Sequence, residues 1–460
     1  MQQSTHTICA FEVGSSKISG LIAERKSEDL FHILAYDSVS SSAFVRKGRI
    51  VNIDQATAAV IKLKEKLQTA TGLQIHKAYI AINPLSLRSE NNTAVHDFGE
   101  EEQRVTEEIV GMLSNDNGQK QTVGREILNV ITQEYRTSNR TVFNPEGELT
   151  RSLVASFVNI TIESEAKMHV EKCFQEAGIK ALDTPTSAEA AGLVALSEQD
   201  KQRGCILVDM GASVTSVSVY KNGQIGYLRL IPLGGHNITL DLCNLKEATL
   251  DEADAEWLKL KSGSAYTESR VRNRQTEQEK EYVSLPNGRG VPLDSVERCT
   301  AARAEEIAIN VAEQIRNSLL LEEGKGIVYL IGGNANLREM ANVIKFKTDR
   351  EVRLCTEIRT SLHLTGTTIN LKEMCAYSLL GAAYQCGDHC VSSQIEETPI
   401  TREGDLFTPE PSPTVPQSTN QTVEPEVTPL KPKTETKRNN LWGQLKNKLE
   451  TFTTEMTQTK

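Results

Sequence analysis

Residues 204–235, GCILVDMGASVTSVSVYKNGQIGYLRLIPLGG, decide the fold. Apolar residues alternate along this segment and predict a strand that ends on Asp209, a turn at Gly211 and a second strand. Residues 221–224, KNGQ, have the composition of a hairpin turn, so a third strand is expected after them. The segment therefore predicts consecutive strands with an acid at the end of the first one.

A similar pattern occurs near the N-terminus, at residues 7–25, TICAFEVGSSKISGLIAER. Glu12 takes the place of Asp209 there, two residues before Gly14, and another extended segment follows at 31–41. Two copies of one unit, about two hundred residues apart, predict a duplicated α/β architecture.

The rest of the sequence sets the domain organisation. A helix is expected at 54–72, with Asp54 as its N-cap. Eight of the fourteen prolines fall between Pro399 and Pro432, and a segment with so little to bury is expected to be a disordered linker. The predicted parts are 1–82, the first half; 83–163, an inserted α+β subdomain; 164–200, the return to the first half; 201–239, the second half; 240–300, its smaller subdomain; 301–372, the rest of the second half; 373–390, a last helix returning to the first half; 391–436, the linker; and 437–456, an amphipathic helix.

Composition narrows the class of protein. The 460 residues carry a net charge of −10, which argues against a nucleic-acid binder. The nine cysteines are an odd number without the spacing of a disulfide framework, so a reducing compartment is expected. The cluster CGDHC at 386–390 lacks a second cysteine pair at metal-site spacing. We expect no secretory signal and no bilayer-spanning segment.

Two short turns carry the first chemical signal: EVGSSK at 12–17 and DMGASVTS at 209–216. Backbone amides of such turns can cradle phosphate oxygens, while acids at the strand ends hold Mg²⁺ through water. Lys17 would then neutralise phosphate charge. Either turn alone is also compatible with a simple strand connection, but the presence of one in each half favours phosphate binding.

A third signal lies at 327–340, IVYLIGGNANLREM, where a buried strand ends at the start of a helix. Gly332 and Gly333 would let the backbone approach a flat ligand such as a purine. The alternative interpretation is plain strand-to-helix packing.

These motifs, together with AEWLKLKSGSA at 255–265 and SLLGAA at 378–383, resemble the phosphate, adenosine and connecting motifs of the actin-like ATPase superfamily, which includes sugar kinases and heat-shock chaperones. More narrowly, the chain resembles the FtsA family of bacterial cell division proteins. An insertion carrying ILNVITQEY at 127–135 and a terminal amphipathic segment are the specific marks. The resemblance covers roughly residues 5–390 and the final helix, and it implies an actin-like (ribonuclease-H-like) duplicated fold.

The resemblance also implies an ATP site with Mg²⁺. It places Gly14, Ser15, Ser16 and Lys17 on one side of the triphosphate, Gly211, Ala212 and Ser213 on the other, Glu256 and Lys259 at the ribose and base, Gly332, Gly333 and Asn334 at the adenosine, and Glu12 and Asp209 near the metal, through water.

Several positions depart from the family pattern. The family usually has Asp where this chain has Glu12, and Ala212, Ser213 and Ser216 replace two glycines and a second acid. The lost glycines restrict close backbone approach. The lost acid removes a candidate for orienting the attacking water. We therefore expect ATP binding with slow hydrolysis or none, and we assign no catalytic residue.

The terminal segment 437–456 has one apolar side. On a helical wheel the large apolar residues fall within a sector of roughly 100°. This is the layout of a helix that lies in a membrane interface; the alternative is docking on the protein's own body, but the linker and an interfacial tryptophan favour the membrane. The predicted membrane residues are Leu441, Trp442, Leu445, Lys446, Lys448, Leu449, Phe452 and Met456.

By resemblance, the chain is expected to be an adaptor on the cytoplasmic face of the cell membrane at the division site. It would self-associate into filaments on an anionic membrane surface and tether the tubulin-like FtsZ, which would dock on 240–300. The insertion at 83–163 would contact neighbouring protomers or later division proteins. The alternatives are a pilus-biogenesis adaptor and a small-molecule kinase of the same superfamily; the missing acid at Ser216 and the terminal helix argue against the kinase.

Overall fold

The computed structural model describes residues 6–27, 30–120, 123–246, 248–267, 281–357, 363–367, 380–381, 383 and 391–392. These all belong to one compact unit, 1–394. The CGDHC cluster, the linker beyond residue 392 and the amphipathic segment with all its predicted membrane residues lie outside the described residues, as does most of 373–390.

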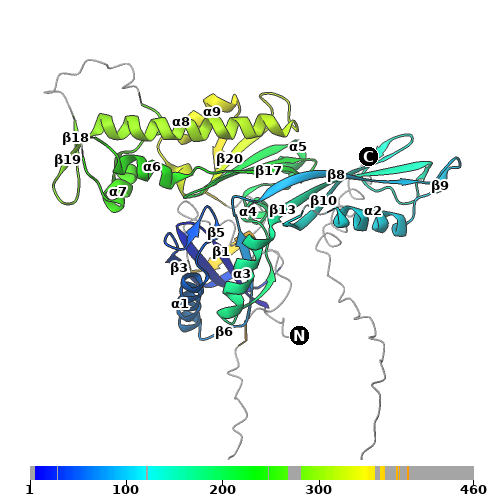
Figure 1. Cartoon of the computed structure of the whole chain (residues 1–460), viewed down its shortest axis with the longest axis horizontal. Helices are drawn as coiled ribbons and strands as arrows, with labels where there is room; N and C mark the ends of the chain where they lie inside the picture. The colour runs from blue at the N-terminus through cyan, green and yellow to red at the C-terminus, as the bar shows by residue number, and fades with distance from the viewer. Residues whose placement is uncertain are drawn as a thin grey trace, which may run out of the picture. The chain divides into compact units, whose positions relative to one another are not determined.

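Two sheets form the two halves (Figure 1), and five strands of the first follow the same order as the five strands of the second; a sixth strand adds to the edge of the first sheet. In each, three strands consecutive in the chain pair antiparallel, and two later strands add in parallel on the other side of the first one. The predicted duplicated architecture is therefore confirmed. The first sheet runs β14 (Lys180–Asp183), β7 (Lys77–Ile82), β1 (His6–Val13), β2 (Lys17–Arg25), β3 (Leu30–Ser40) and β22 (His363–Gly366); the second runs β17 (Gln224–Ile231), β16 (Thr215–Lys221), β15 (Cys205–Met210), β20 (Ile327–Ile331) and β21 (Val352–Leu354).

Helices α1 (Ile53–Thr71) and α3 (Ser164–Glu176) pack on each other beside the first sheet (Figure 1). The buried residues of α1 recur every three or four positions, which is the spacing of one helix face. The predicted N-cap, Asp54, is wrong: Asn52 caps the helix, and its side chain accepts a hydrogen bond from the Gln55 amide at 3.0 Å. The helix begins one residue earlier than expected, so Asp54 lies inside its first turn.

The second half is covered by α8 (Leu293–Ser318), which packs against β16, β17 and α9 (Met340–Thr348). The turn between β16 and β17 is the predicted hairpin, with positive φ at Asn222 and Gly223. Among the described residues, no helix combines the length and apolar character that a bilayer span needs. The remaining short elements are α4 (Ser187–Ala195), α5 (Glu198–Arg203), η3 (Gly333–Asn336), β4 (Val45–Arg46), β5 (Arg49–Ile50), β6 (Gln74–Ile75) and β23 (Val391–Ser392).

Between β7 and α3 the chain forms a separate antiparallel sheet with one helix, α2, on its face (Figure 1). A buried amide pair fixes that helix: Asn117 and Asn159 donate to each other's side-chain oxygens, at 2.8 and 3.0 Å. The elements are β11 (Thr141–Val142), β10 (Arg125–Thr137), β13 (Ser152–Glu163) and β8 (Arg88–Asp97) in sheet order, the pair β9 (Gln103–Arg104) and β12 (Leu149–Thr150), and α2 (Glu107–Gln119).

This inserted sheet contacts the second half through β8 and β17. Ser89 Oγ accepts a hydrogen bond from the Leu228 amide at 2.9 Å, and the Arg229 guanidinium donates to the Ser89 carbonyl. Gln133 of β10 donates to the Ile225 carbonyl at 3.1 Å. The inserted sheet is thus attached to both halves, because its chain ends join the first half.

A smaller cluster of elements follows β17. Helices α6 (Gly235–Cys243) and α7 (Glu252–Ser262) pack with the hairpin of β18 (Tyr282–Ser284) and β19 (Gly290–Pro292) around their own apolar core. The polar stretch 266–290 thus ends in a hairpin, while 268–280 lie outside the described residues.

Candidate functional site

The two predicted phosphate turns have the same geometry. Gly14 donates its amide to the Lys17 carbonyl at 3.1 Å, and Gly211 donates to the Val214 carbonyl at 3.0 Å. A Cβ would lie 2.8 Å from the carbonyl oxygen at Gly14 and 2.9 Å from it at Gly211, which is too close for a side chain. The chain therefore needs glycine at both positions to close these tight turns.

The two turns meet each other. Ser213 Oγ of the second turn donates to Ser15 Oγ of the first at 2.5 Å, although the residues lie 198 positions apart. Ser15 Oγ also accepts from the Gly48 amide at 2.8 Å. In the same first turn Ser16 is exposed and Lys17 is half-buried. The fold thus brings together the two glycine-serine turns that the sequence singles out.

The two strand-end acids differ in their surroundings. Glu12 is buried, and Ser187 donates to its Oε1 at 3.1 Å. Burial raises the pKa of Asp209 to about 6. The described residues contain no group of three or more His, Cys, Asp or Glu side chains arranged to hold a metal directly. A metal held through water by Glu12 and Asp209 stays a prediction.

The predicted adenosine motif lies directly against the second acid. Gly332 has φ +89°, and a Cβ there would lie 2.5 Å from Asp209 Oδ1 and 2.7 Å from the Met210 carbonyl oxygen. At Gly333 the corresponding Cβ would meet no atom within 4 Å, so open space lies beside this glycine. Asn334 is only 7% exposed, and its Nδ2 has no hydrogen-bond partner among the described residues. A buried donor without a partner is costly, and a ligand that accepts from it would remove that cost.

The first turn of α6 joins these parts, and the sequence reasoning missed it. Gly235 donates its amide to the Gly211 carbonyl at 3.0 Å, and His236 donates to the Ala212 carbonyl at 2.7 Å. A Cβ on Gly234 would lie 2.6 Å from each of these carbonyl oxygens. The sequence contains one signal of this contact, the glycine pair that ends the segment 204–235. The carbonyl groups that the pair contacts lie more than twenty positions earlier in the chain, so the sequence alone does not reveal them.

Gly235 also faces the adenosine motif, because a Cβ on it would lie 3.0 Å from Asn334 Oδ1. On its other side the ammonium group of Lys259 donates to the Gly235 carbonyl at 3.2 Å. One glycine therefore touches the second turn, the adenosine motif and α7, which together carry most of the predicted contacts of the second half.

Helix α7 holds Glu256 and Lys259 one turn apart. Lys259 Nζ donates to Glu256 Oε2 at 2.6 Å and to Thr239 Oγ1 of α6 at 3.1 Å. The Thr239 hydroxyl in turn donates to Glu256 Oε2 at 2.5 Å. Both predicted residues are thus brought next to the α6 glycine pair.

Helix α4 connects the first acid to the inserted sheet. Ser187 at its start contacts Glu12, and two residues on Glu189 accepts from Asn129 of β10 at 2.8 Å. Thr186 also donates to Glu189, at 2.8 Å, and burial is the main cause that raises the pKa of this carboxyl. Helix α4 therefore links Glu12 to the inserted sheet through side-chain hydrogen bonds.

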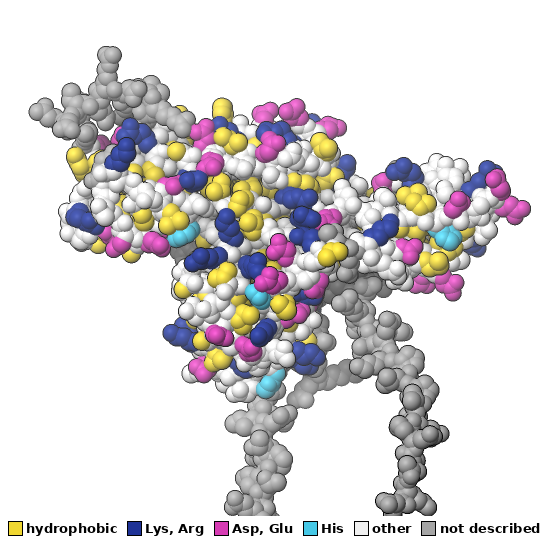
Figure 2. Space-filling view, viewed as in Figure 1, with side chains coloured by type: hydrophobic (Ala, Val, Ile, Leu, Met, Phe, Trp, Pro, Cys, Tyr) yellow, Lys and Arg dark blue, Asp and Glu magenta, His cyan; other side chains and the backbone are white. Residues whose placement is uncertain are grey.

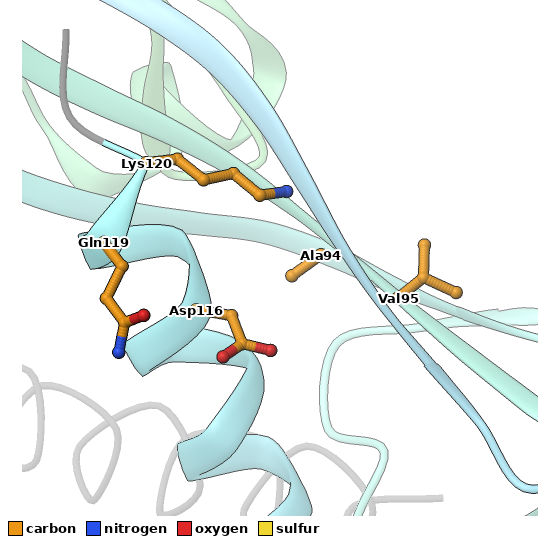
Figure 3. A pocket seen from close by; sticks show the side chains of 5 residues that line it. All are labelled: Ala94, Val95, Asp116, Gln119 and Lys120. Atoms are coloured by element: carbon orange, nitrogen blue, oxygen red, sulfur yellow. The ribbon is translucent and has the colours of Figure 1, made fainter.

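A separate hollow of about 300 Å³ lies on the inserted sheet, between the end of α2 and β8 (Figure 3). Its lining residues are Ala94, Val95, Asp116, Gln119 and Lys120. Lys120 donates to the Thr93 carbonyl of β8 at 2.8 Å. None of the predicted site residues lines this hollow.

Figure 2 shows acidic and basic side chains interspersed over the face that it presents. Acidic side chains also gather at the end of the inserted sheet and along the edge formed by α8 and α9. Glu100, Glu101 and Glu102, which directly precede β9 in the chain, are exposed.

Comparison with known proteins gives one consistent family. The family model described as "Cell division protein FtsA" matches residues 206–368. The chain is 25% identical to Cell division protein FtsA of Bacillus subtilis over 365 residues, 78% of this chain and 81% of that protein. It is 23% identical to Cell division protein FtsA of Escherichia coli over 376 residues, 78% of this chain and 86% of that protein.

Among solved structures, the "PilM-PilN type IV pilus biogenesis complex" matches with a TM-score of 0.53 and 15% identity, over 82% of this chain and 98% of that chain. At this identity the likeness shows the fold alone. The predicted actin-like fold and the predicted resemblance to cell division FtsA proteins are both confirmed.

Proposed function

We propose that this chain is a cell division protein of the FtsA type, which binds ATP between its two halves and links FtsZ polymers to the cytoplasmic face of the cell membrane. The observation that carries the nucleotide part is the contact of Ser213 with Ser15, because it puts two glycine turns of matched geometry face to face. Phosphate oxygens would accept hydrogen bonds from such turns.

The residues present fit a nucleotide in three respects. Gly333 leaves open space where a flat base could approach the backbone. The unpartnered Nδ2 of Asn334 supplies a buried donor beside it. Lys17 supplies a positive charge in the first turn. Mg²⁺, when bound, would neutralise phosphate charge, with Glu12 and Asp209 as the acids that hold its water ligands.

Hydrolysis is proposed to be slow or absent. Ser216 pairs with Asp209 across β15 and β16, and its buried hydroxyl has no hydrogen-bond partner among the described residues. The carboxylate that this position would need to orient an attacking water is missing. ATP would then act as a ligand that favours one arrangement of the two halves, and filament formation would follow that arrangement.

The membrane part of the proposal rests on the sequence pattern of 437–456. A linker of about 40 residues has a reach on the order of 35 Å, so the body would lie beside the bilayer. One short helix binds weakly, and a filament that presents many copies would bind tightly through avidity. We propose FtsZ docking on 240–300, and contacts of 83–163 with neighbouring protomers or later division proteins.

The nucleotide part is tested by measuring ATP affinity and ATP turnover separately on the purified full chain. Micromolar binding with turnover far below one per second would support the proposal. Brisk turnover stimulated by a small hydroxylated substrate would favour a kinase instead. Electron microscopy on a lipid monolayer, with and without ATP, tests whether filaments require nucleotide.

The membrane part is tested by co-sedimentation with vesicles that contain anionic lipid. The full chain is expected to pellet and to bring FtsZ with it, whereas a chain that ends at Pro432 should stay in the supernatant. Equal pelleting of both forms would contradict the membrane role of the helix. A full chain that pellets without FtsZ would favour a different adaptor, such as a pilus-biogenesis protein, whose fold is similar.

A further inference from the structure

The short hairpin of β4 and β5 packs against the first phosphate turn. The Gly48 amide donates to Ser15 Oγ at 2.8 Å. A Cβ on Gly48 would lie 2.1 Å from the Asn83 carbonyl oxygen, so a side chain does not fit between these two segments. The Lys47 carbonyl accepts from the Leu85 amide at 3.0 Å. The hairpin is therefore fixed to the first phosphate turn on one side and to the end of β7 on the other.

The turn of this hairpin places a lysine where the backbone is strained. The register of β4 and β5 leaves Lys47 and Gly48 as a two-residue turn, and both have positive φ, 49° and 74°. Such turns favour Asn-Gly, and the hairpin between β16 and β17 has that pair, at Asn222 and Gly223. Strained residues of this kind cluster at ligand sites. The Lys47 side chain is therefore expected to have a function that asparagine cannot supply, and its positive charge is the difference.

The charge of Lys47 is available to a ligand. Its side chain is exposed and has no hydrogen-bond or ion-pair partner among the described residues. Its Cα is one carbonyl carbon away from the Gly48 amide nitrogen, which bonds to Ser15. The flexible four-carbon stem can therefore carry the ammonium group to an anion held at Ser15. Lys17, half-buried in the first phosphate turn, has no such partner in the described part of the chain either, so two lysine charges are available near one turn.

The Ser15 hydroxyl gives independent evidence for an anion at this place. Its Oγ accepts two hydrogen bonds, from the Gly48 amide at 2.8 Å and from Ser213 Oγ at 2.5 Å. Both lone pairs of the hydroxyl are then used, and its own proton has no acceptor within the part of the chain that the structure describes. A phosphate oxygen can accept that proton and can also pair with a lysine ammonium group. Ser15 and Lys47 therefore fit the same kind of ligand.

We propose that Lys47 is a further phosphate-binding residue of the nucleotide site, supplied to the first phosphate turn by the β4–β5 hairpin and acting beside Lys17. The bond between Gly48 and Ser15 fixes the base of the Lys47 side chain next to the turn. Because the contact is with phosphate, Lys47 contributes to the binding of ATP and not to that of adenosine. This inference rests on the proposed binding of ATP between the two halves.

The test measures the affinities of the full chain and its variants for ATP and for adenosine by calorimetry. Lys47→Asn is the decisive variant, because asparagine suits the positive φ and removes the charge. It should weaken ATP binding about tenfold at low salt, which is the effect of losing a hydrogen bond to a charged group, and leave adenosine affinity within about twofold. The loss should shrink at high salt, because salt screens the attraction between lysine and phosphate. The unfolding temperature should be no lower than that of the wild type.

Two further variants separate the contact from a general effect of charge. Lys47→Arg keeps the charge and should keep ATP affinity within about threefold of the wild type. Lys62→Gln is the matched control, because Lys62 is an exposed lysine of α1 in the same half and has no ion-pair partner among the described residues. It removes the same charge and should leave ATP affinity within about twofold of the wild type.

Three results would overturn the inference. In the first, Lys47→Asn binds ATP as tightly as the wild type does. In the second, Lys47→Asn weakens ATP and adenosine by the same factor, which would make Lys47 a support of the fold. In the third, Lys62→Gln weakens ATP as much as Lys47→Asn does, as a general loss of positive charge would. A wild type that binds neither ATP nor adenosine would instead contradict the proposed function itself.

Discussion

Gly332 lies directly against Asp209: a Cβ on the glycine would stand 2.5 Å from the Asp209 carboxylate oxygen. The same residue has φ +89°, where side chains are strained. The next residue, Gly333, differs completely, because a Cβ there would meet no protein atom within 4 Å. Two adjacent glycines are thus required for different reasons, one by the fold and the other, on our proposal, by the ligand.

Gly332→Ala should destabilise the fold by about 2–4 kcal/mol, from backbone strain and from the contact with Asp209. Gly333→Ala should change stability by less than about 0.5 kcal/mol, yet weaken ATP binding about tenfold, because the methyl group fills the space proposed for the base. Thermal denaturation and calorimetric titration measure the two effects. Unchanged ATP affinity in Gly333→Ala would place the base elsewhere.

The buried Asp209 carboxyl should lower the free energy of unfolding of the nucleotide-free protein at neutral pH. Burial raises the pKa of this carboxyl from 3.8 to about 6 in the fold. Between these values the unfolded carboxyl has lost its proton while the folded one keeps it, so this group's contribution falls as pH rises from about 4 to about 6 and stays low above that. Asp209→Asn should therefore stabilise the nucleotide-free protein at pH 7.5 by about 1–3 kcal/mol, and should not do so at pH 4.

The same variant should lose the effect of Mg²⁺ on ATP affinity if Asp209 helps to hold the metal's water ligands. Denaturant titrations at the two pH values, with and without Mg-ATP, test both statements. Asp116→Asn, an exposed acid on α2, is the control and should change neither quantity. A stabilised variant that still binds Mg-ATP as tightly as the wild type would remove Asp209 from the metal site.

The duplicated fold could be predicted from sequence because its signals are local. Alternating apolar residues, a strand-end acid and a glycine two positions later define each copy, and these features need no knowledge of distant residues. The predicted N-cap of α1 was wrong although its signal is also local. Asn52 and Asp54 are both good capping residues, and only the residue at which the helix begins decides between them.

The arrangement of the site was harder to predict, because its contacts join distant segments. Ser213 meets Ser15 only after the two halves pack together. Lys259 looks like a ligand contact in the sequence, but the packing of α6 on α7 supplies it with internal acceptors. In the sequence, the Gly234–Gly235 pair looks like the end of a strand. Its role becomes visible only in the fold, where the Gly235 amide donates to the Gly211 carbonyl of the second turn.

The amide pair of Asn117 and Asn159 should be essential to the inserted sheet. Asn117 is fully buried, and Asn92 also donates to its side-chain oxygen, at 2.7 Å. Asn117→Leu would leave the other two amides without partners and should cost about 2–4 kcal/mol. Hydrogen exchange of α2 would report the loss, and Asn115→Leu, the same change on the exposed side of α2, should leave exchange unaltered. Equal protection in both variants would contradict the role of the pair.

The apolar side of the predicted helix 437–456 should contribute more to membrane binding than the net charge of the segment does. On a helical wheel with Leu441 at 0° and about 100° per residue, Leu445 lies at about 40°, near the centre of the apolar sector, and Asn447 lies at about −120°, on the opposite side. Leu445→Glu and Asn447→Glu add the same negative charge, so long-range repulsion from anionic lipid affects both alike. Only Leu445→Glu also buries a carboxylate in the interface, and it should abolish pelleting with vesicles, while Asn447→Glu should weaken it only modestly and less so at high salt. If the two variants lose binding equally, attraction between charges and not apolar insertion would hold the chain at the membrane.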